Sequence, residues 1–234
     1  MEKYTYALLL VGSIMIPLVR SFEDKVRFHK YLVPLFAGIF IMSLVFISWD
    51  VIFTRNGVWW FAHEYVLGIY LLGLPIEEWL FFVVIPYCVM FIYEVLRYFF
   101  PHFVFPRTVF VVSLALAIAF IVIAALNTQR IYTLVVMLLT GLLLISQLGL
   151  RNHKTWLSHF FLTYLVSLIP FFIVNGVLTS RPVVSYNDLE NLGIRLYTIP
   201  VEDSVYLMGM MLMVNMVYER VKSARNKKTA SGLR

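Results

Sequence analysis

Residues 73–78 read Gly-Leu-Pro-Ile-Glu-Glu, and residues 198–203 read Thr-Ile-Pro-Val-Glu-Asp. The two stretches are 125 residues apart, and the same offset gives nine identities in the 33 positions from 65 to 97. Shared hydrophobicity alone would give fewer identities, so we infer an internal repeat. The identical pairs are Leu67/Leu192, Gly68/Gly193, Ile69/Ile194, Leu71/Leu196, Pro75/Pro200, Glu77/Glu202, Val89/Val214, Tyr93/Tyr218 and Glu94/Glu219.

The composition around the repeat is that of a membrane protein. Of the 234 residues, 61% are hydrophobic and 14% are charged, whereas soluble domains have roughly 45–50% and 25%. Apolar runs of about 20 residues, the length that crosses a bilayer, fill nearly the whole chain. The sequence therefore predicts an all-α polytopic membrane protein that has no separate soluble catalytic domain.

The apolar runs between charged, proline and glycine breaks predict the helices. There are seven predicted transmembrane helices: Tyr4–Val19, Tyr31–Trp49, Pro75–Tyr98, Thr108–Leu126, Ile131–Leu150, Trp156–Leu178 and Pro200–Arg220. The first run ends without a small-residue cleavage pattern, so we expect a retained helix. Neither Val58–Leu72 nor Ser180–Thr198 is long and apolar enough to span, and the first mixes aromatic and polar residues as interfacial or re-entrant segments do.

The repeat offset superposes the first helix on the fifth, the second on the sixth and the third on the seventh. The fourth helix has no counterpart, so the two three-helix repeats must share one membrane orientation, with a pseudo-axis along the membrane normal. We therefore predict a first repeat at 1–100, a linker helix at 101–128, a second repeat at 129–222 and a basic cytoplasmic tail at 223–234. A site between the repeats would receive equivalent residues from both.

The net charge of +6 comes from one end of the chain. Residues 220–234 hold six Lys or Arg and no acid, while residues 1–219 hold thirteen of each sign. Seven spans place five basic residues on the side of the N-terminus and fourteen on the other, which predicts a cytoplasmic C-terminus and an outer N-terminus in the cell membrane. We interpret the tail as a topology anchor that attracts anionic lipid headgroups and do not expect a nucleic-acid partner.

The acidic residues of the repeat are the first functional candidates, because a carboxylate inside the hydrocarbon costs several kcal/mol and usually serves a function. Glu77 and Glu202 follow first-turn prolines, where a Glu can also cap free N–H groups, so both interpretations stay open. Glu78 and Asp203 lie about 100° further around the helix and are poorly placed for the same cap. Pairing with Arg97 and Lys222 three residues on explains Glu94 and Glu219.

If the two acidic turns face one another, up to four carboxyls share a poorly hydrated region. Desolvation and mutual repulsion then favour the protonated form of at least one of them, which can act as a Brønsted acid. The same offset pairs Asp50 with Asn175 at the end of the preceding helix. Aromatic side chains near these turns are mostly expected to pack, but together their ring faces suit a carbocation. With Asn175, the substrate-binding candidates are Trp49, Trp79, Phe81, Phe82 and Tyr206.

Several chemistries lack their sequence signals. The chain has no Gly-x-Gly, so it has neither a dinucleotide fingerprint nor a phosphate-binding loop. The five His are scattered without close pairs, no Asp-rich diphosphate motif occurs, and no Lys lies within a predicted span. Cys88 is the only cysteine, which excludes an intramolecular disulfide. We therefore expect no metal site.

Three stretches together resemble the membrane-integral lycopene β-cyclase family, whose bacterial forms are heterodimers and whose archaeal and fungal forms are fused. They are Trp49-Asp50, the run from Pro75 to Phe82 and the run from Pro200 to Tyr206. The resemblance extends over essentially the whole chain, and the doubled Pro-x-Glu-(Glu/Asp) is its most specific element. The chain departs from equivalence at Asn175, so we expect the halves to differ in the site.

The resemblance implies conversion of lycopene through γ-carotene to β-carotene, with both polyenes arriving from the lipid and with carotenoid-pathway enzymes as partners. The reaction is redox-neutral: protonation of an end alkene, ring closure and loss of a ring proton. It implies Glu78 or Asp203 as proton donor, Glu77 and Glu202 as cation-stabilising or proton-accepting partners, and Asp50 as an orienting or reloading group. No dinucleotide domain is present, so we expect no organic cofactor.

A transporter or proton-conducting protein is the main alternative, because it would use the same acids as a relay and the repeat as a rocking pair. Against it, the acids cluster at one end of the helices. A non-catalytic assembly subunit of a carotenoid complex, in which the acids would merely cap, is the third interpretation. Two intact repeats in one chain argue against that role.

Overall fold

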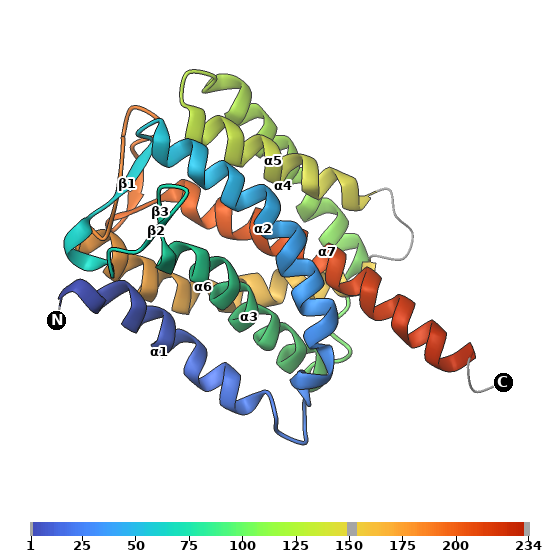
Figure 1. Cartoon of the computed structure of the whole chain (residues 1–234). Helices are drawn as coiled ribbons and strands as arrows, with labels where there is room; N and C mark the ends of the chain where they lie inside the picture. The colour runs from blue at the N-terminus through green and yellow to red at the C-terminus, as the bar shows by residue number, and fades with distance from the viewer. Residues whose placement is uncertain (1, 149–153, 232–234) are drawn as a thin grey trace.

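The computed structural model describes residues 2–148 and 154–231, and this part of the chain folds into a helical bundle with short strands at one end (Figure 1). The long helices are α1 (Thr5–Arg20), α2 (Leu32–Arg55), α3 (Ile76–Phe99), α4 (Pro106–Leu126), α5 (Ile131–Leu148), α6 (Lys154–Ser180) and α7 (Val201–Ser231). Short 3-10 turns are η1 (Glu2–Tyr4), η2 (Phe28–Tyr31) and η3 (His63–Tyr65). The predicted all-α class and helix order are confirmed.

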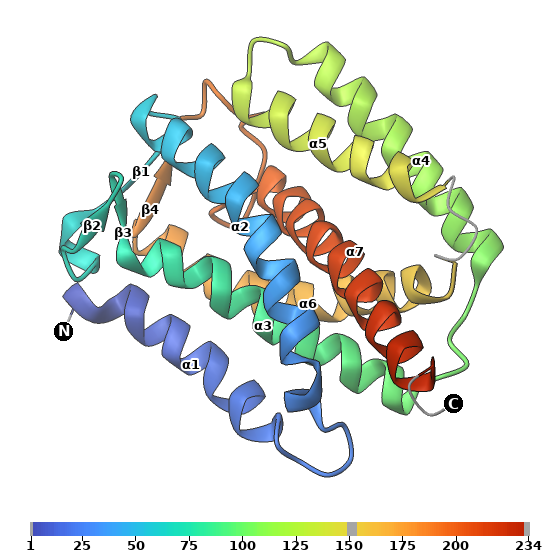
Figure 2. The same cartoon turned by 45° about the vertical axis from the view of Figure 1, so that its right-hand side comes forward.

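Six of these helices, α1 to α6, are long and apolar enough to cross a membrane. Their outer faces expose large apolar side chains, among them Leu8, Phe40, Ile118 and Leu165, as expected for surfaces that face lipid. The seventh, α7, is less apolar because it has Glu202 and Asp203 in its first turn and ends in a basic stretch. It lies inside the bundle, between α2, α5 and α6 (Figure 2). Its residues from Val205 to Val214 are mostly buried against protein.

The two repeats interlock. Within each repeat the first helix packs on the third, α1 on α3 and α5 on α7. Between repeats the middle helix packs on the other repeat's third helix, α2 on α7 and α6 on α3. The unmatched α4 lies along α5 and also contacts α6. Helices α3 and α7 each pack on helices of both repeats. Side chains from both repeats can therefore surround the first turns of α3 and α7.

Two predicted helix ends differ from the observed ends. The second helix was expected to end at Trp49, but α2 continues to Arg55 because no proline or glycine follows Trp49 until Gly57. Asp50 therefore lies within the helix. The seventh was expected to end at Arg220, but α7 continues to Ser231 and its end projects beyond the bundle (Figure 1). The end predicted for the fifth helix, Leu150, lies outside the described residues.

The two non-spanning segments form short antiparallel strands at the N-terminal end of the bundle. These strands are β1 (Trp59–Phe61), β2 (Tyr70–Leu71), β3 (Leu74–Pro75), β4 (Val184–Tyr186), β5 (Arg195–Leu196) and β6 (Ile199–Pro200). β2 pairs with β3, and β5 pairs with β6 in the same register. β1 pairs with β4, with Trp60 opposite Ser185, two positions that differ by the repeat offset of 125. The pseudo-twofold axis therefore passes through the middle of this ribbon.

At the opposite end of the bundle, ion pairs join α3 and α7 crosswise. Arg97 pairs with Glu219, and Lys222 Nζ lies 2.6 Å from Glu94 Oε1. The expected pairing within one helix is present only for Arg97 and Glu94, at 3.8 Å. The closer pairs connect the repeats because α3 and α7 run side by side there, and Tyr93 and Tyr218 hydroxyls donate to the same two carboxyls.

We predict that Glu94→Gln lowers the free energy of unfolding by about 3 kcal/mol, because the substitution leaves the charge of the buried Lys222 without its carboxylate. The side chains of Lys222 and Glu94 are only 13% and 7% exposed. Thermal unfolding in detergent measures the change. The matched control is Glu23→Gln, which removes the exposed Arg20–Glu23 pair and should cost less than about 1 kcal/mol. Equal effects of the two substitutions would contradict the buried pairing.

Candidate active site

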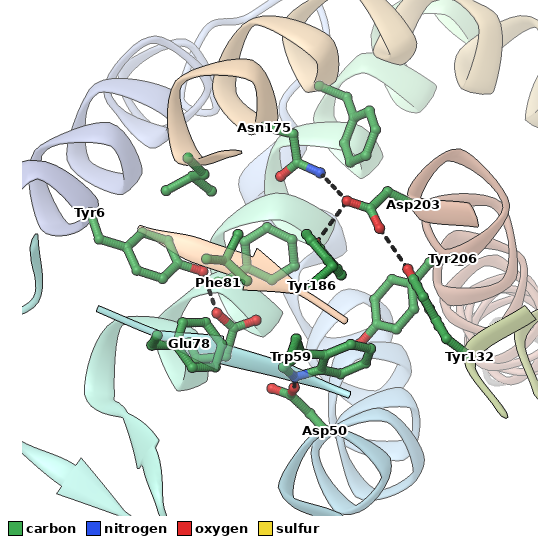
Figure 3. A pocket seen from close by; sticks show the side chains of 14 residues that line it. Tyr6, Asp50, Trp59, Glu78, Phe81, Tyr132, Asn175, Tyr186, Asp203 and Tyr206 are labelled. Carbon is green, nitrogen blue, oxygen red and sulfur yellow. Dashed lines mark hydrogen bonds between the residues drawn. The ribbon is translucent and has the colours of Figure 1, made fainter. Parts of the chain in front are cut away.

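A small cavity lies at the N-terminal end of the bundle, beneath the β1–β4 ribbon (Figure 3). Its volume is about 60 Å³, which is room for a few water molecules. Three carboxyl groups line it, and they come from both repeats: Asp50, Glu78 and Asp203. The other lining residues are Tyr6, Trp59, Phe61, Phe81, Tyr132, Phe171, Asn175, Leu178, Val184, Tyr186 and Tyr206.

Glu78 and Asp203 hold equivalent positions in the first turns of α3 and α7, and each accepts a hydrogen bond from a tyrosine on the first helix of its own repeat. Tyr6 donates to Glu78 Oε2 at 2.5 Å, and Tyr132 donates to Asp203 Oδ1 at 2.6 Å. Asp203 accepts two more, from Tyr186 at 2.8 Å and from Asn175 at 3.1 Å. Since hydrogen bonds to a carboxylate stabilise its ionised form, Asp203 is better suited to stay ionised than Glu78 is.

The predicted difference between the repeats at Asp50 and Asn175 has a structural counterpart. Asn175 donates its amide N–H to Asp203, the acid of its own repeat. Asp50 instead accepts from Trp59 Nε1 at 2.6 Å, and its Oδ2 has no hydrogen-bond partner among the described residues. The cavity thus holds a carboxyl with a free oxygen on the first repeat's side and an amide on the other.

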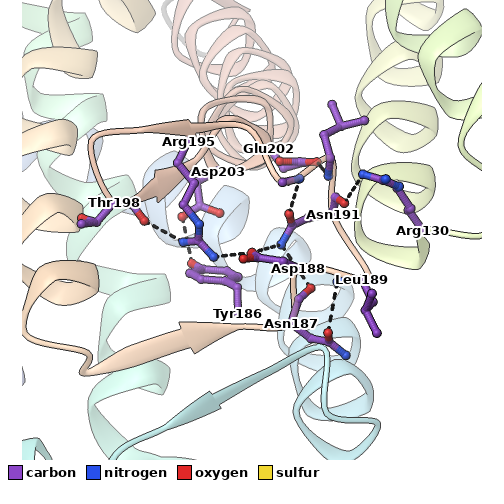
Figure 4. Close-up of polar contacts among 12 residues, drawn as sticks. Arg130, Tyr186, Asn187, Asp188, Leu189, Asn191, Arg195, Thr198, Glu202 and Asp203 are labelled. Atoms are coloured by element: carbon purple, nitrogen blue, oxygen red, sulfur yellow. Dashed lines mark hydrogen bonds and ion pairs between the residues drawn. The ribbon is translucent and has the colours of Figure 1, made fainter.

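The loop from Asn187 to Thr198 fixes Tyr186 over the cavity (Figure 4). Arg195 pairs with Asp188, donates to the Thr198 carbonyl at 2.8 Å and lies 6.0 Å from the centre of the Tyr186 ring. The hydrogen bond from Arg195 lowers the pKa of Asp188. The ion pair is therefore fully formed at any pH above the ordinary Asp pKa, and it is lost as the pH falls through the lowered pKa of Asp188. Burial raises the pKa of Tyr186, so its hydroxyl keeps the proton that it donates.

Glu77 and Glu202 are fully buried, but neither is among the described residues that line the cavity. Glu77 Oε1 accepts from the backbone N–H of Leu67 at 2.6 Å, and Glu202 Oε1 accepts from that of Leu192 at 2.7 Å. Each acid therefore anchors the loop that precedes its own helix. Glu202 also accepts from the Thr133 hydroxyl at 2.6 Å, which ties the start of α5 to the same point.

The predicted aromatic candidates separate into three groups. Phe81 and Tyr206, which are equivalent in the repeat, line the cavity. Trp49 and Phe82 are buried behind it, where Trp49 packs 5.1 Å from the Tyr206 ring. Trp79 lies on another surface, between α2 and α3, and donates to the Leu71 carbonyl.

The sequence did not identify four polar aromatic residues of the cavity: Tyr6, Trp59, Tyr132 and Tyr186. Tyrosines near the ends of spanning helices are ordinarily interface anchors, so Tyr6 and Tyr132 carried no distinguishing signal. Their distances from Glu78 and Asp203 differ by one residue, 72 and 71 positions, which hides their equivalence at the offset of 125. Trp59 and Tyr186 meet through a ribbon between segments that are remote in sequence.

A family model described as lycopene cyclase matches residues 3–96 and 129–221. The chain belongs to the lycopene cyclase family. The two matched segments are the two repeats, and the unmatched stretch between them contains α4. No curated protein and no solved structure matches the chain. Membership of this family supports a carotenoid substrate and a cyclisation activity, in a protein whose helices suit a membrane.

We predict that Glu202→Gln and Glu202→Leu will differ in stability. The Gln carbonyl can still accept from Leu192 and Thr133, so it should cost about 1 kcal/mol or less, whereas Leu leaves two donors unpaired at roughly 1–3 kcal/mol each. Thermal unfolding in detergent measures both. A Gln variant that is as stable as the unmodified protein but forms no ring would instead give Glu202 a chemical role.

Proposed function

We propose that the chain is a lycopene β-cyclase that converts lycopene through γ-carotene to β-carotene. The observation that carries this proposal is the shared cavity, in which Asp50, Glu78 and Asp203 face one another among aromatic rings. Proton-initiated ring closure needs an acid, a base and a dry pocket that tolerates a cation. Family membership supports the substrate class.

The proposed step begins with transfer of a proton from the Glu78 carboxyl to the alkene at one end of the polyene. The electron pair of that double bond forms the new C–H bond and leaves a tertiary cation. The neighbouring double bond attacks the cation and closes the ring, and loss of one ring proton to a carboxylate forms the ring alkene. One proton enters and one leaves, so no oxidant or reductant is consumed.

We assign the donor role to Glu78 because it accepts one side-chain hydrogen bond whereas Asp203 accepts three. Asp203, held as a carboxylate, stabilises the cation and takes the ring proton. We propose that Asp50, whose Oδ2 has no partner among the described residues and which lines the same cavity, returns a proton to Glu78. Glu77 and Glu202 are proposed to position the loops and, through them, the first turns of α3 and α7.

The aromatic lining suits a cationic intermediate. Trp59, Tyr132 and Tyr186 form a connected set, with the Trp59 and Tyr132 ring centres 5.1 Å apart and the Tyr132 and Tyr186 rings stacked at 6.1 Å. Ring faces attract a cation without offering a nucleophile that would capture it. Their tyrosine hydroxyls point at Asp203, so the rings also fix the position of the base.

A proton relay is less well supported than catalysis. A relay requires ionisable groups through the membrane, whereas the acids gather in two clusters at opposite ends of α3 and α7. Between Glu78 and Glu94, α3 buries Phe82, Val89 and Met90. This apolar interval favours a closed reaction site over a conducting path.

We further propose that the protein resides in the cell membrane with the cavity toward the outer face. Tyr6, near the N-terminus, is part of the cavity, and the excess of basic residues marks the opposite end as cytoplasmic. The γ-carotene intermediate, lipid contacts and hand-over to other carotenoid enzymes belong to this proposal as well.

Expression in cells that accumulate lycopene, followed by pigment analysis, tests the function. The unmodified chain should form β-carotene, and Glu78→Gln or Asp203→Asn should reduce ring formation by at least about 100-fold, as expected when a general acid or base is removed. The control is Glu64→Gln, an exposed acid on the same side of the bundle, which should retain activity. Unchanged lycopene with well-inserted unmodified protein would contradict the proposal.

Reaction in heavy water gives a second readout. External protonation should place one deuterium in each ring formed, detectable by mass spectrometry of the product. Rings without deuterium would show that the proton does not come from an exchangeable carboxyl.

A further inference from the structure

The wall of the acid cavity continues into a larger apolar hollow on the outside of the bundle, between α1, α3 and α6. This groove has a volume of about 420 Å³ and shares Phe81, Phe171 and Asn175 with the cavity. Its rim residues Leu8 and Ile173 are 63% and 65% exposed. The groove therefore lies between the lipid-facing surface and the wall of the acid cavity, and we call it the α1–α3–α6 groove.

The corresponding region on the other side of the pseudo-twofold axis is filled by aromatic rings. The offset of 125 places Phe46 at the position of Phe171 and Trp49 at that of Val174. Phe46 is fully buried, and both rings pack on Tyr206, at centre distances of 5.0 Å and 5.1 Å. Side chains therefore fill the region between α5, α7 and α2, whereas the equivalent region between α1, α3 and α6 is an open groove.

The first helix of each repeat also differs in side-chain size: α1, which borders the groove, has a smaller side chain than α5 at the equivalent position. A Cβ added to Gly12 on α1 would meet nothing within 4 Å, so there is open space beside this position. Aligning Tyr6 with Tyr132 places Leu138 of α5 at the position of Gly12. On α3 and α7, Ile85 lines the groove while its counterpart Met210 is fully buried.

We propose that a linear polyene enters from the lipid through the α1–α3–α6 groove and that both of its ends reach the carboxyls by this one route, one after the other. The inference rests on the proposed function. Glu78 and Asp203 line one cavity, so only one end can lie between them at a time. After the first ring forms, the chain must withdraw, reverse and re-enter, which makes the monocyclic product a released intermediate.

A second apolar groove provides a matched control. It lies between α2 and α3, has a volume of about 750 Å³ and includes Ser43 and Trp79 in its lining. Among the described residues it shares none with the acid cavity. A side chain that obstructs this groove should leave access to the carboxyls intact.

The test compares Gly12→Leu with Ser43→Leu in membranes supplied with lycopene. Each variant adds one branched apolar side chain to one groove, and Gly12 has space for it, so the fold should persist. Gly12→Leu should lower the rate of ring formation by roughly tenfold or more, the effect of a misfit of one or more methylenes in an apolar site. Ser43→Leu should have the rate of the unmodified protein. Thermal unfolding in detergent confirms that both variants are folded.

The outcomes separate the two proposals. An unmodified protein that forms no rings refutes the cyclase function itself. If folded Gly12→Leu forms rings at the rate of the unmodified protein, the route is refuted and the groove holds only lipid chains. A loss of ring formation in Ser43→Leu alone would also refute the route. If Gly12→Leu does not fold, Gly12→Val provides the same comparison with a smaller side chain.

A labelling measurement tests the order of events. Isotopically labelled monocyclic carotene is mixed with unlabelled lycopene in the same membranes. A released intermediate equilibrates with the added pool, so the dicyclic product should carry the same fraction of label as the free monocyclic carotene. A dicyclic product with much less label than that pool would show that the first product stays bound and would overturn the sequential route.

Discussion

Carboxyl groups buried in an apolar bundle need hydrogen-bond donors, because an unpaired buried charge costs several kcal/mol. The donors to these acids come mainly from the loops before α3 and α7 and from the first helix of each repeat, so their hydrogen bonds connect these parts of the bundle. Backbone N–H groups of the preceding loops donate to Oε1 of Glu77 and of Glu202, which fixes the starts of α3 and α7, while Oε2 of each has no partner among the described residues. Tyrosines of α1 and α5 satisfy Glu78 and Asp203, which fixes the first helix of each repeat against the third. The same bonds aim the second acid of each pair at the cavity.

Contacts between the two repeats bring their equivalent acids to one shared cavity. The β1–β4 ribbon joins the repeats at the cavity end, and the crosswise pairs of Arg97 with Glu219 and Lys222 with Glu94 join them at the other end. These links hold the two repeats together at both ends of the bundle, and between the ends α2 packs on α7 and α6 packs on α3. The repeats nevertheless differ at the cavity, where Asn175 stands at the position of Asp50, and beside it, where Phe46 and Trp49 pack on Tyr206 in the region equivalent to the groove.

The sequence predicted the helices, the repeat and the acids of the cavity because hydrophobic periodicity and a doubled motif are local signals. It left two roles open for Glu77 and Glu202, a helix cap and a chemical role. The observed bonds come from the backbone N–H groups of Leu67 and Leu192, ten residues earlier in the preceding loops, so these acids tie down the loops and do not cap the helices. Trp59 and Tyr186 could not be predicted, since strand pairing between remote loops leaves no local pattern. The crosswise ion pairs were missed because the i+3 spacing of Glu94 with Arg97 and of Glu219 with Lys222 already suits a pair within one helix, and the sequence carries no signal for a partner on another helix.

The central claim is that one polyene end lies between carboxyls from both repeats. An experimental structure of the protein in a lipid nanodisc with an acyclic C40 polyene bound would test it most directly. Density for one end of the polyene is expected between Glu78 and Asp203, with density for the remainder along the α1–α3–α6 groove. Density for the polyene end in the α2–α3 groove beside Trp79, away from both carboxyls, would contradict it.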